Sequence, residues 1–117
     1  MIRTEIETPE LQFSACHDGI GTILCRSYLN AGDSAEGLVL FHSDILPPGT
    51  SIGEHPHTVG EEIYYLVEGE CDLIEDGKRI PMKPGDFQIV GGGHSHGIVN
   101  TGSTNARLIV VGANKNV

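Results

Sequence analysis

Residues 49–69, GTSIGEHPHTVGEEIYYLVEG, carry the pattern from which the fold and the chemistry of this chain can be approached. Two histidines one residue apart, His55 and His57, are followed by an acidic pair, Glu61 and Glu62. Residues i and i+2 of a β-strand point to one face about 6.6 Å apart, so the two imidazoles can converge on one ion. The next strand alternates in the same way, so only one of the two glutamates can face that ion.

A second histidine pair with the same spacing, His94 and His96, lies in residues 91–100, GGGHSHGIVN. Imidazole nitrogens with one carboxylate suit Fe, Mn, Ni, Co, Cu or Zn, because these ions bind nitrogen far better than Mg or Ca do. Three histidines and one glutamate around a six-coordinate ion would leave two positions for water or substrate, as a catalytic site requires. The spacing alone does not decide between His94 and His96.

The rest of the chain predicts an all-β fold. Sixteen glycines and six prolines separate short apolar runs, which is typical of strands joined by tight turns. Asp76-Gly77 is the sharpest turn signal, because a type I′ hairpin needs positive φ at both central positions. The pattern predicts a β-sandwich or barrel with strands at residues 21–29, 37–45, 51–57, 62–67, 71–75, 78–82, 86–90, 96–100 and 106–111.

The length of 117 residues predicts one compact domain. Residues 1–20 lack clear periodicity, so we expect an N-terminal arm there and a single barrel domain over residues 21–117. Arms of this kind often pack on a partner subunit. One exposed sheet edge and this arm both need covering, which favours a homodimer.

The composition limits the classes of partner. Seven Lys and Arg against sixteen Asp and Glu give a net charge of −9, which disfavours nucleic acid, since binding there depends on cationic side chains. No stretch approaches about 18 apolar residues and the start carries no apolar signal run, so no membrane association and a cytoplasmic location are expected. Three cysteines without CxxC spacing are expected to be reduced thiols.

With both histidine pairs in view, the chain resembles a small single-domain cupin of type 2. The first cupin motif is a glycine, five residues, His-x-His, three or four residues, a glutamate, six residues and a glycine. Gly49, His55, His57, Glu62 and Gly69 match every interval.

The second cupin motif is a glycine, five residues, Pro-x-Gly, two residues, a histidine, three residues and an asparagine. Gly85, Gly93, His96 and Asn100 match it, and these intervals favour His96 over His94. Gly91 departs from the family pattern, which usually has proline there, and this puts the shape of the turn before His96 in doubt.

The resemblance covers about residues 37–111. It implies a cupin double-stranded β-helix, a jelly-roll-like barrel of two antiparallel sheets. It also implies one divalent transition metal, bound through His55, His57, Glu62 and His96. Because cupins host several kinds of enzyme and also binding modules on one scaffold, the fold does not choose among them.

Two functions are therefore expected as alternatives. The first is a metal-dependent enzyme that acts on a small oxygen-rich molecule, such as a carboxylate or a diketone. The second is a non-catalytic module that binds a small metabolite or a sugar. A positioned acid or base would favour the enzyme, and the candidates are His42, Tyr64 and Tyr28.

Each candidate has a simpler alternative. His42 alternates in phase with Leu38 and Leu40 and can face the barrel interior, although a surface position is the alternative. Tyr64 shares the face of Glu62, where packing in the core is the alternative. His17 is expected at the surface. For His94 we keep two interpretations, a hydrogen bond that orients a metal ligand and an exposed turn position.

Overall fold

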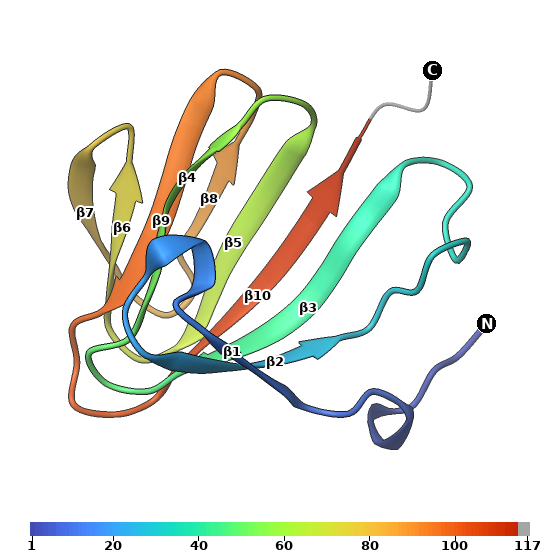
Figure 1. The fold of residues 1–117 in the computed structure, drawn as a ribbon, viewed down its shortest axis with the longest axis horizontal. Helices are drawn as coiled ribbons and strands as arrows, with labels where there is room; N and C mark the ends of the chain where they lie inside the picture. Colours follow the sequence, from blue (N-terminus) through green and yellow to red (C-terminus); the bar gives the residue numbers. More distant parts are fainter. Residues whose placement is uncertain (115–117) are drawn as a thin grey trace.

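Ten strands form two antiparallel sheets in the structure, a computed structural model that describes residues 1–114 (Figure 1). Two short 3-10 helices, η1 (Glu5–Glu7) and η2 (Cys16–Asp18), lie in the N-terminal segment. The strands are β1 (Leu11–Ser14), β2 (Thr22–Ser27), β3 (Leu38–Leu46), β4 (Ser51–His57), β5 (Glu61–Glu68), β6 (Cys71–Glu75), β7 (Lys78–Met82), β8 (Phe87–Val90), β9 (His94–Asn100) and β10 (Ala106–Ala113).

The larger sheet has the order β1-β2-β3-β10-β5-β8, and the smaller sheet has the order β4-β9-β6-β7. The all-β prediction of a barrel of two antiparallel sheets is confirmed. Each of the nine predicted strands has a counterpart, and β4, β6 and β7 have the predicted bounds. β9 begins two residues earlier than predicted, because its ladder with β4 extends to the pair His57 and His94.

The Asp76-Gly77 turn joins β6 to β7 as predicted. Asp76 has a φ of 47° and Gly77 a φ of 80°, and Glu75 pairs with Lys78 across the turn. Positive φ at both central residues matches the right-handed twist of the two strands. The hairpin therefore forms as the sequence indicated.

The inward-facing side chains change from apolar to polar along the barrel. On β5 they run from Leu66 through Tyr64 to Glu62, and on β9 from Ile98 to His96. All five are buried. The apolar end is the core between the sheets, which contains Ile23, Leu46, Ile52, Tyr64, Leu66, Cys71, Leu73, Met82, Ile98, Ala106, Leu108 and Val110.

The first twenty residues are partly built into the barrel. β1 pairs with β2 at the edge of the larger sheet, and η2 packs against β4, where Figure 1 shows this segment in blue. β1 was not among the predicted strands, because its apolar and polar residues alternate over only four positions, and all four residues are exposed. The division at residue 20 stays a prediction, and residues 115–117 of the predicted domain lie outside the described residues.

Two further observations concern the described chain as a whole. Within residues 1–114, no helix has the length and apolar character needed to cross a bilayer. Cys16, Cys25 and Cys71 are all free thiols, in agreement with their odd number.

Candidate metal centre

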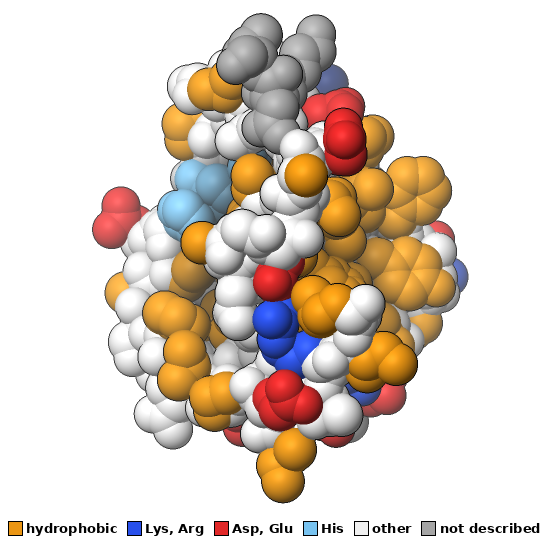
Figure 2. Space-filling view, turned by 90° about the vertical axis from the view of Figure 1, so that its right-hand side faces the viewer, with side chains coloured by type: hydrophobic (Ala, Val, Ile, Leu, Met, Phe, Trp, Pro, Cys, Tyr) orange, Lys and Arg blue, Asp and Glu red, His pale blue; other side chains and the backbone are white. Residues whose placement is uncertain are grey.

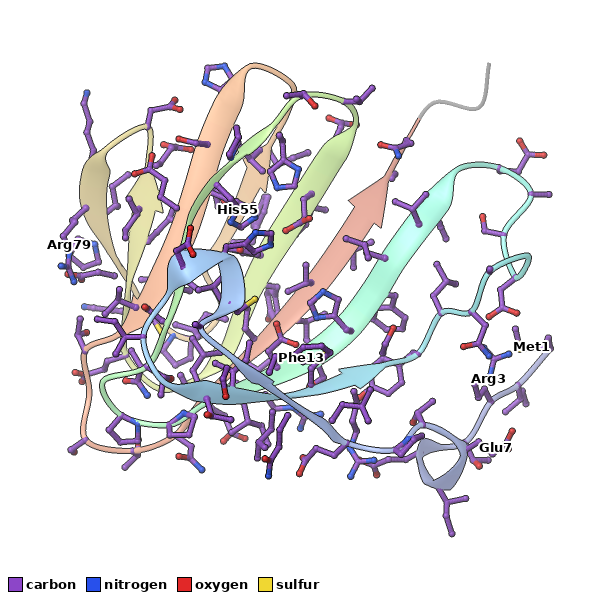
Figure 3. All side chains as sticks on the ribbon, in the orientation of Figure 1. Met1, Arg3, Glu7, Phe13, His55 and Arg79 are labelled. Carbon is purple, nitrogen blue, oxygen red and sulfur yellow. The ribbon has the colours of Figure 1, made fainter. Side chains whose placement is uncertain are left out.

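Two neighbouring strands of the smaller sheet and one strand of the larger sheet bring His55, His57, Glu62 and His96 together. Figure 3 labels His55, which lies on β4. In the ladder of β4 with β9, His55 lies opposite His96, after a β-bulge that follows Ile52. β4 is an edge strand, where Pro56 can lie between the two histidines without leaving a ladder partner unpaired. One possible ligand atom from each of the four residues lies within 4.8 Å of the others.

The distances within this group match those between ligands of one ion. His57 Nε2 lies 3.0 Å from His96 Nε2, and His96 Nε2 lies 3.2 Å from Glu62 Oε1. His57 Nε2 lies 3.6 Å from Glu62 Oε2. Two donors at about 2.1 Å from one ion and at right angles are about 3.0 Å apart. The donor set of imidazole nitrogens and one carboxylate therefore fits a transition metal in geometry and in chemistry.

Hydrogen bonds at Nδ1 fix the tautomers of two of the histidines, His55 and His96. His96 Nδ1–H donates to Gln88 Oε1 at 2.7 Å, and Gln88 Nε2 donates to Glu75 Oε1 at 3.0 Å. His55 Nδ1–H donates to the carbonyl oxygen of Gly53 at 2.8 Å. With its proton on Nδ1, each ring keeps the Nε2 lone pair free for an ion.

The protonation states also suit metal binding. Burial lowers the pKa of His55, although the hydrogen bond to Gly53 opposes this effect, and burial also lowers the pKa of His57. Burial alone would raise the pKa of Glu62, but the contact of its carboxylate with His96 and the other nearby imidazoles outweigh burial and lower that pKa. At neutral pH these two imidazoles are neutral and the carboxyl is ionised, as metal binding requires.

Aromatic rings pack on two of the histidines. The Tyr64 ring is stacked on His96 with centroids 3.9 Å apart, and the His17 ring is stacked on His55 with centroids 3.7 Å apart. Burial, together with the charges of Glu62 and Asp44, raises the pKa of Tyr64 well above its usual value. Tyr64 thus shares the inward face of β5 with Glu62, and its ring contacts the ring of His96.

Three of the four residues, His55, His57 and Glu62, border a cavity of about 400 Å³, whereas His96 is fully buried and does not line it. At about 30 Å³ for each water of the liquid, this volume equals roughly thirteen waters, which is enough for a small acid and its solvent. His42 also borders the cavity, and its Nδ1 lies 2.7 Å from Asp44 Oδ1. The cavity is lined by Cys16, His17, Leu40, His42, Asp44, Ile52, His55, Pro56, His57, Glu62, Tyr64 and Val110.

Two other residues singled out in the sequence lie away from this cavity. The His94 side chain is 63% exposed, and its Nδ1 lies 2.8 Å from Asp76 Oδ2, so His94 is exposed as one interpretation expected, although it is the first residue of β9 rather than part of the turn. Tyr28 packs on Phe41, with ring centroids 5.0 Å apart, and does not line the cavity.

Several residues of the site were not found from the sequence. His17 is exposed as expected, yet its ring covers His55. Cys16 and Asp44 line the cavity, and Gln88 supports His96 from behind. Only Gln88 had a usable signal, because it alternates in phase with Val90 and a polar side chain on a buried face needs a partner.

Comparison with known proteins gives one family and several relatives. The model of the family described as "Cupin domain" matches residues 43–112. The chain is 35% identical over 111 residues to the oxalate-binding protein of Thermotoga maritima, covering 95% of this chain and 91% of that protein. It is 33% identical over 57 residues to quercetin 2,3-dioxygenase of Bacillus subtilis, covering 49% of this chain but 17% of that enzyme.

Among solved structures, the chain is similar to a predicted oxalate decarboxylase from Thermotoga maritima. The two superpose with a TM-score of 0.91 at 32% sequence identity, covering 97% of this chain and 99% of the other. The similarity therefore includes the first twenty residues as well as the barrel.

Proposed function

The chain belongs to the cupin family, whose model matches residues 43–112, and on this premise we propose that it binds a small carboxylate of the oxalate class through one divalent transition metal. The proposed ligands of the metal are His55, His57, Glu62 and His96. The observation that carries the proposal is the convergence of these four side chains, with His55 and His96 oriented by acceptors behind them.

The class of ligand follows from charge and from open positions. His55, His57, Glu62 and His96 would hold a divalent ion, which would act as a Lewis acid and, with positions left open, would bind the oxygens of a carboxylate. Glu62 neutralises one of its two charges, so the centre keeps a net positive charge within a protein of net charge −9. A small anion is then attracted to this point of the molecule. The relative of 35% identity, named for oxalate binding, supports the same class.

A second candidate function is a metal-dependent enzyme that acts on the bound carboxylate or on a diketone. It is favoured by the position of His42, which borders the cavity and is held by Asp44. His42 would carry the proton, whereas Tyr64 would act by holding the ring of His96 in place. Assays with oxalate, diketones and flavonols under air separate the candidates, because a binding module binds one of these compounds without converting it.

The decisive experiment compares Glu62→Gln with Glu61→Gln. Metal-free protein is titrated with Mn²⁺, and the loaded protein is then titrated with oxalate, both by calorimetry. Replacing a residue that orients a metal ligand typically weakens metal binding roughly 10–100-fold. Glu62→Gln should weaken it by more than this, because it removes the charged ligand itself. Glu61→Gln, whose side chain is exposed, should bind metal and oxalate as wild type does.

Two results would contradict the proposal. Equal losses in the two variants would mean that Glu62 is not a ligand. Equal binding of oxalate by the metal-free and the loaded protein would mean that the ion does not hold the acid.

We also propose a cytoplasmic location and no nucleic-acid partner. The three free cysteines support a reducing compartment, and the net charge of −9 opposes contact with phosphates. Fractionation of the cells and a gel-shift assay with duplex DNA test these two points.

A homodimer is the remaining part of the proposal. The outer face of the larger sheet carries exposed apolar residues on three strands, among them Phe41, Tyr65, Phe87 and Ile89. Tyr65 lies opposite Phe87 in the ladder of β5 with β8, so these side chains are neighbours. Figure 2 shows hydrophobic side chains gathered on the right, turned away from the histidines on the left. A contiguous apolar face of this kind is typical of a protein interface.

A further inference from the structure

A second group of potential metal ligands lies on the inner face of the larger sheet. Cys25 on β2 is directly opposite Asp44 on β3, and His42 is two residues from Asp44 on the same strand. Opposite residues and i, i+2 residues share a face, so all three side chains point into the barrel. One possible ligand atom from each lies within 4.8 Å of the other two.

The surroundings of this group suit a cation. Asp44 is 1% exposed, and among the ion pairs of residues 1–114 its partner is His42 alone. Cys25 is 9% exposed, and its Sγ lies within 4.8 Å of a carboxylate oxygen of Asp44. A buried carboxylate is costly unless it is paired, so Asp44 is placed to gain from a positive charge.

We propose that Cys25, His42 and Asp44 form a second metal site, for a divalent ion of the Zn²⁺ type, with its fourth position open to the cavity. Sulfur, imidazole and carboxylate ligands together suit Zn²⁺ or Co²⁺. Tetrahedral ligands at about 2.1 Å are about 3.4 Å apart, so His42 Nδ1 and Asp44 Oδ1 need only separate from their present 2.7 Å.

The charges balance in this arrangement. Burial, with the charge of Asp44, raises the pKa of Cys25 to about 12, so the thiol is protonated without an ion. Binding a divalent ion displaces that proton to solvent, and the thiolate and the Asp44 carboxylate then neutralise both charges of the ion. The His42 proton on Nδ1 likewise moves, to Nε2, so that Nδ1 can bind the ion.

This site is independent of the one built around Glu62. β10 lies between β3 and β5 in the sheet, and Val110 separates His42 from Tyr64 in the register. The second site therefore does not depend on the proposed function. It competes only with the role of His42 as a proton carrier, because a metal-bound Nδ1 no longer holds the hydrogen bond to Asp44.

The test is titration of the metal-free protein with Co²⁺ in the absence of oxygen. Wild type should bind two equivalents, and one of them should produce the intense near-ultraviolet absorption of a thiolate bound to cobalt. Cys25→Ser should lose that absorption and keep one equivalent, which also reports that the variant is folded. His42→Ala should fall to one equivalent in the same way, and His57→Ala should keep the thiolate absorption while losing the other equivalent.

Cys16→Ser is the matched control, because Cys16 is the thiol that lines the cavity but lies outside the group. It should keep both equivalents and the absorption. The second site is refuted if wild type gives no thiolate absorption, if Cys25→Ser retains it, or if Cys16→Ser loses it. If the proposed site around Glu62 did not bind metal, the protein would instead lose the Co²⁺ equivalent that produces no thiolate absorption. The two outcomes can therefore be distinguished.

Discussion

At the scale of single residues, His96 is held by three neighbours of different chemistry. Gln88 Oε1 accepts a hydrogen bond from His96 Nδ1–H, and the Tyr64 ring stacks on the imidazole. Glu62 Oε1 lies 3.2 Å from His96 Nε2. Gln88 is itself oriented by a hydrogen bond to Glu75. This chain of contacts leaves the imidazole little freedom to turn away from the other candidate ligands.

Replacement of Gln88 should weaken the metal centre without removing any candidate ligand. In Gln88→Leu the Nδ1 proton of His96 loses its acceptor, so the ring is no longer fixed in one tautomer, and metal affinity should fall about 10–100-fold. Calorimetric titration with Mn²⁺ measures the change. Gln12→Leu, at the other glutamine of the chain and on exposed β1, should leave the affinity as in wild type. Unchanged affinity in a folded Gln88→Leu variant would contradict this role.

At the scale of elements, η2 is packed tightly against β4. A Cβ on Gly53 would overlap the carbonyl oxygen of His17, and a Cβ on Gly19 would overlap the carbonyl oxygen of Ser51. Ala15, His17 and Asp18 have φ values of 52°, 50° and 61°, a left-handed conformation that costs L-residues about 1–2 kcal/mol each. The close packing against β4 holds these residues in place, and with them the His17 ring over His55.

Gly53→Ala should therefore displace η2. The new methyl group meets backbone that cannot move away cheaply, and we expect a loss of about 1–3 kcal/mol in the free energy of unfolding. Denaturation by urea measures this loss, and the NMR signals of the His17 and His55 rings should shift as the stack opens.

Gly91→Ala is the control, because Gly91 lies in the turn before β9 and a methyl group added there would meet open space. Its unfolding free energy should change by about 0.5 kcal/mol or less. Similar losses in both variants would show that the contact with His17 is not what makes Gly53 necessary.

At the scale of the whole molecule, the two sides of the larger sheet have different roles. The inner side contributes Glu62 and His42 to the cavity, whereas the outer side is apolar and exposed, with Phe87 64% and Ile89 52% accessible. Pairing of this face between two copies would leave both cavities open, because the cavity residues of this sheet point the other way.

The association should be sensitive to a charge on this face. Light scattering at micromolar concentration should give wild type twice the chain mass of 12.5 kDa, and Ile89→Lys should reduce it to one chain, because a buried lysine without a partner is unfavourable. Ile20→Lys is the control, since Ile20 is exposed between η2 and β2, where its carbonyl oxygen accepts from Ser51 N on β4 of the smaller sheet. A monomeric wild type, or a dimeric Ile89→Lys, would contradict the homodimer.

The sequence by itself predicted nine of the ten strands of residues 1–114, the hairpin turn and the separation of the two neighbouring glutamates onto opposite faces. Alternation puts Glu61 and Glu62 on opposite faces, because a strand has a period of two, so only one of them can face the site, and the motif interval favours Glu62. Asp76-Gly77 meets a local backbone requirement. Motif spacing then selected His55, His57 and His96, which the structure brings together with Glu62.

Only the tertiary structure decided which distant residues share the cavity. Gln88 lies behind His96, His17 lies over His55, and Cys25 meets Asp44 because of how the strands pair and where the arm packs. A period-two pattern fixes the face that a side chain occupies but not the neighbouring strand, since pairing depends on the packing of the whole barrel. For that reason the candidate ligands could be predicted from the sequence, whereas the residues that orient and surround them could not.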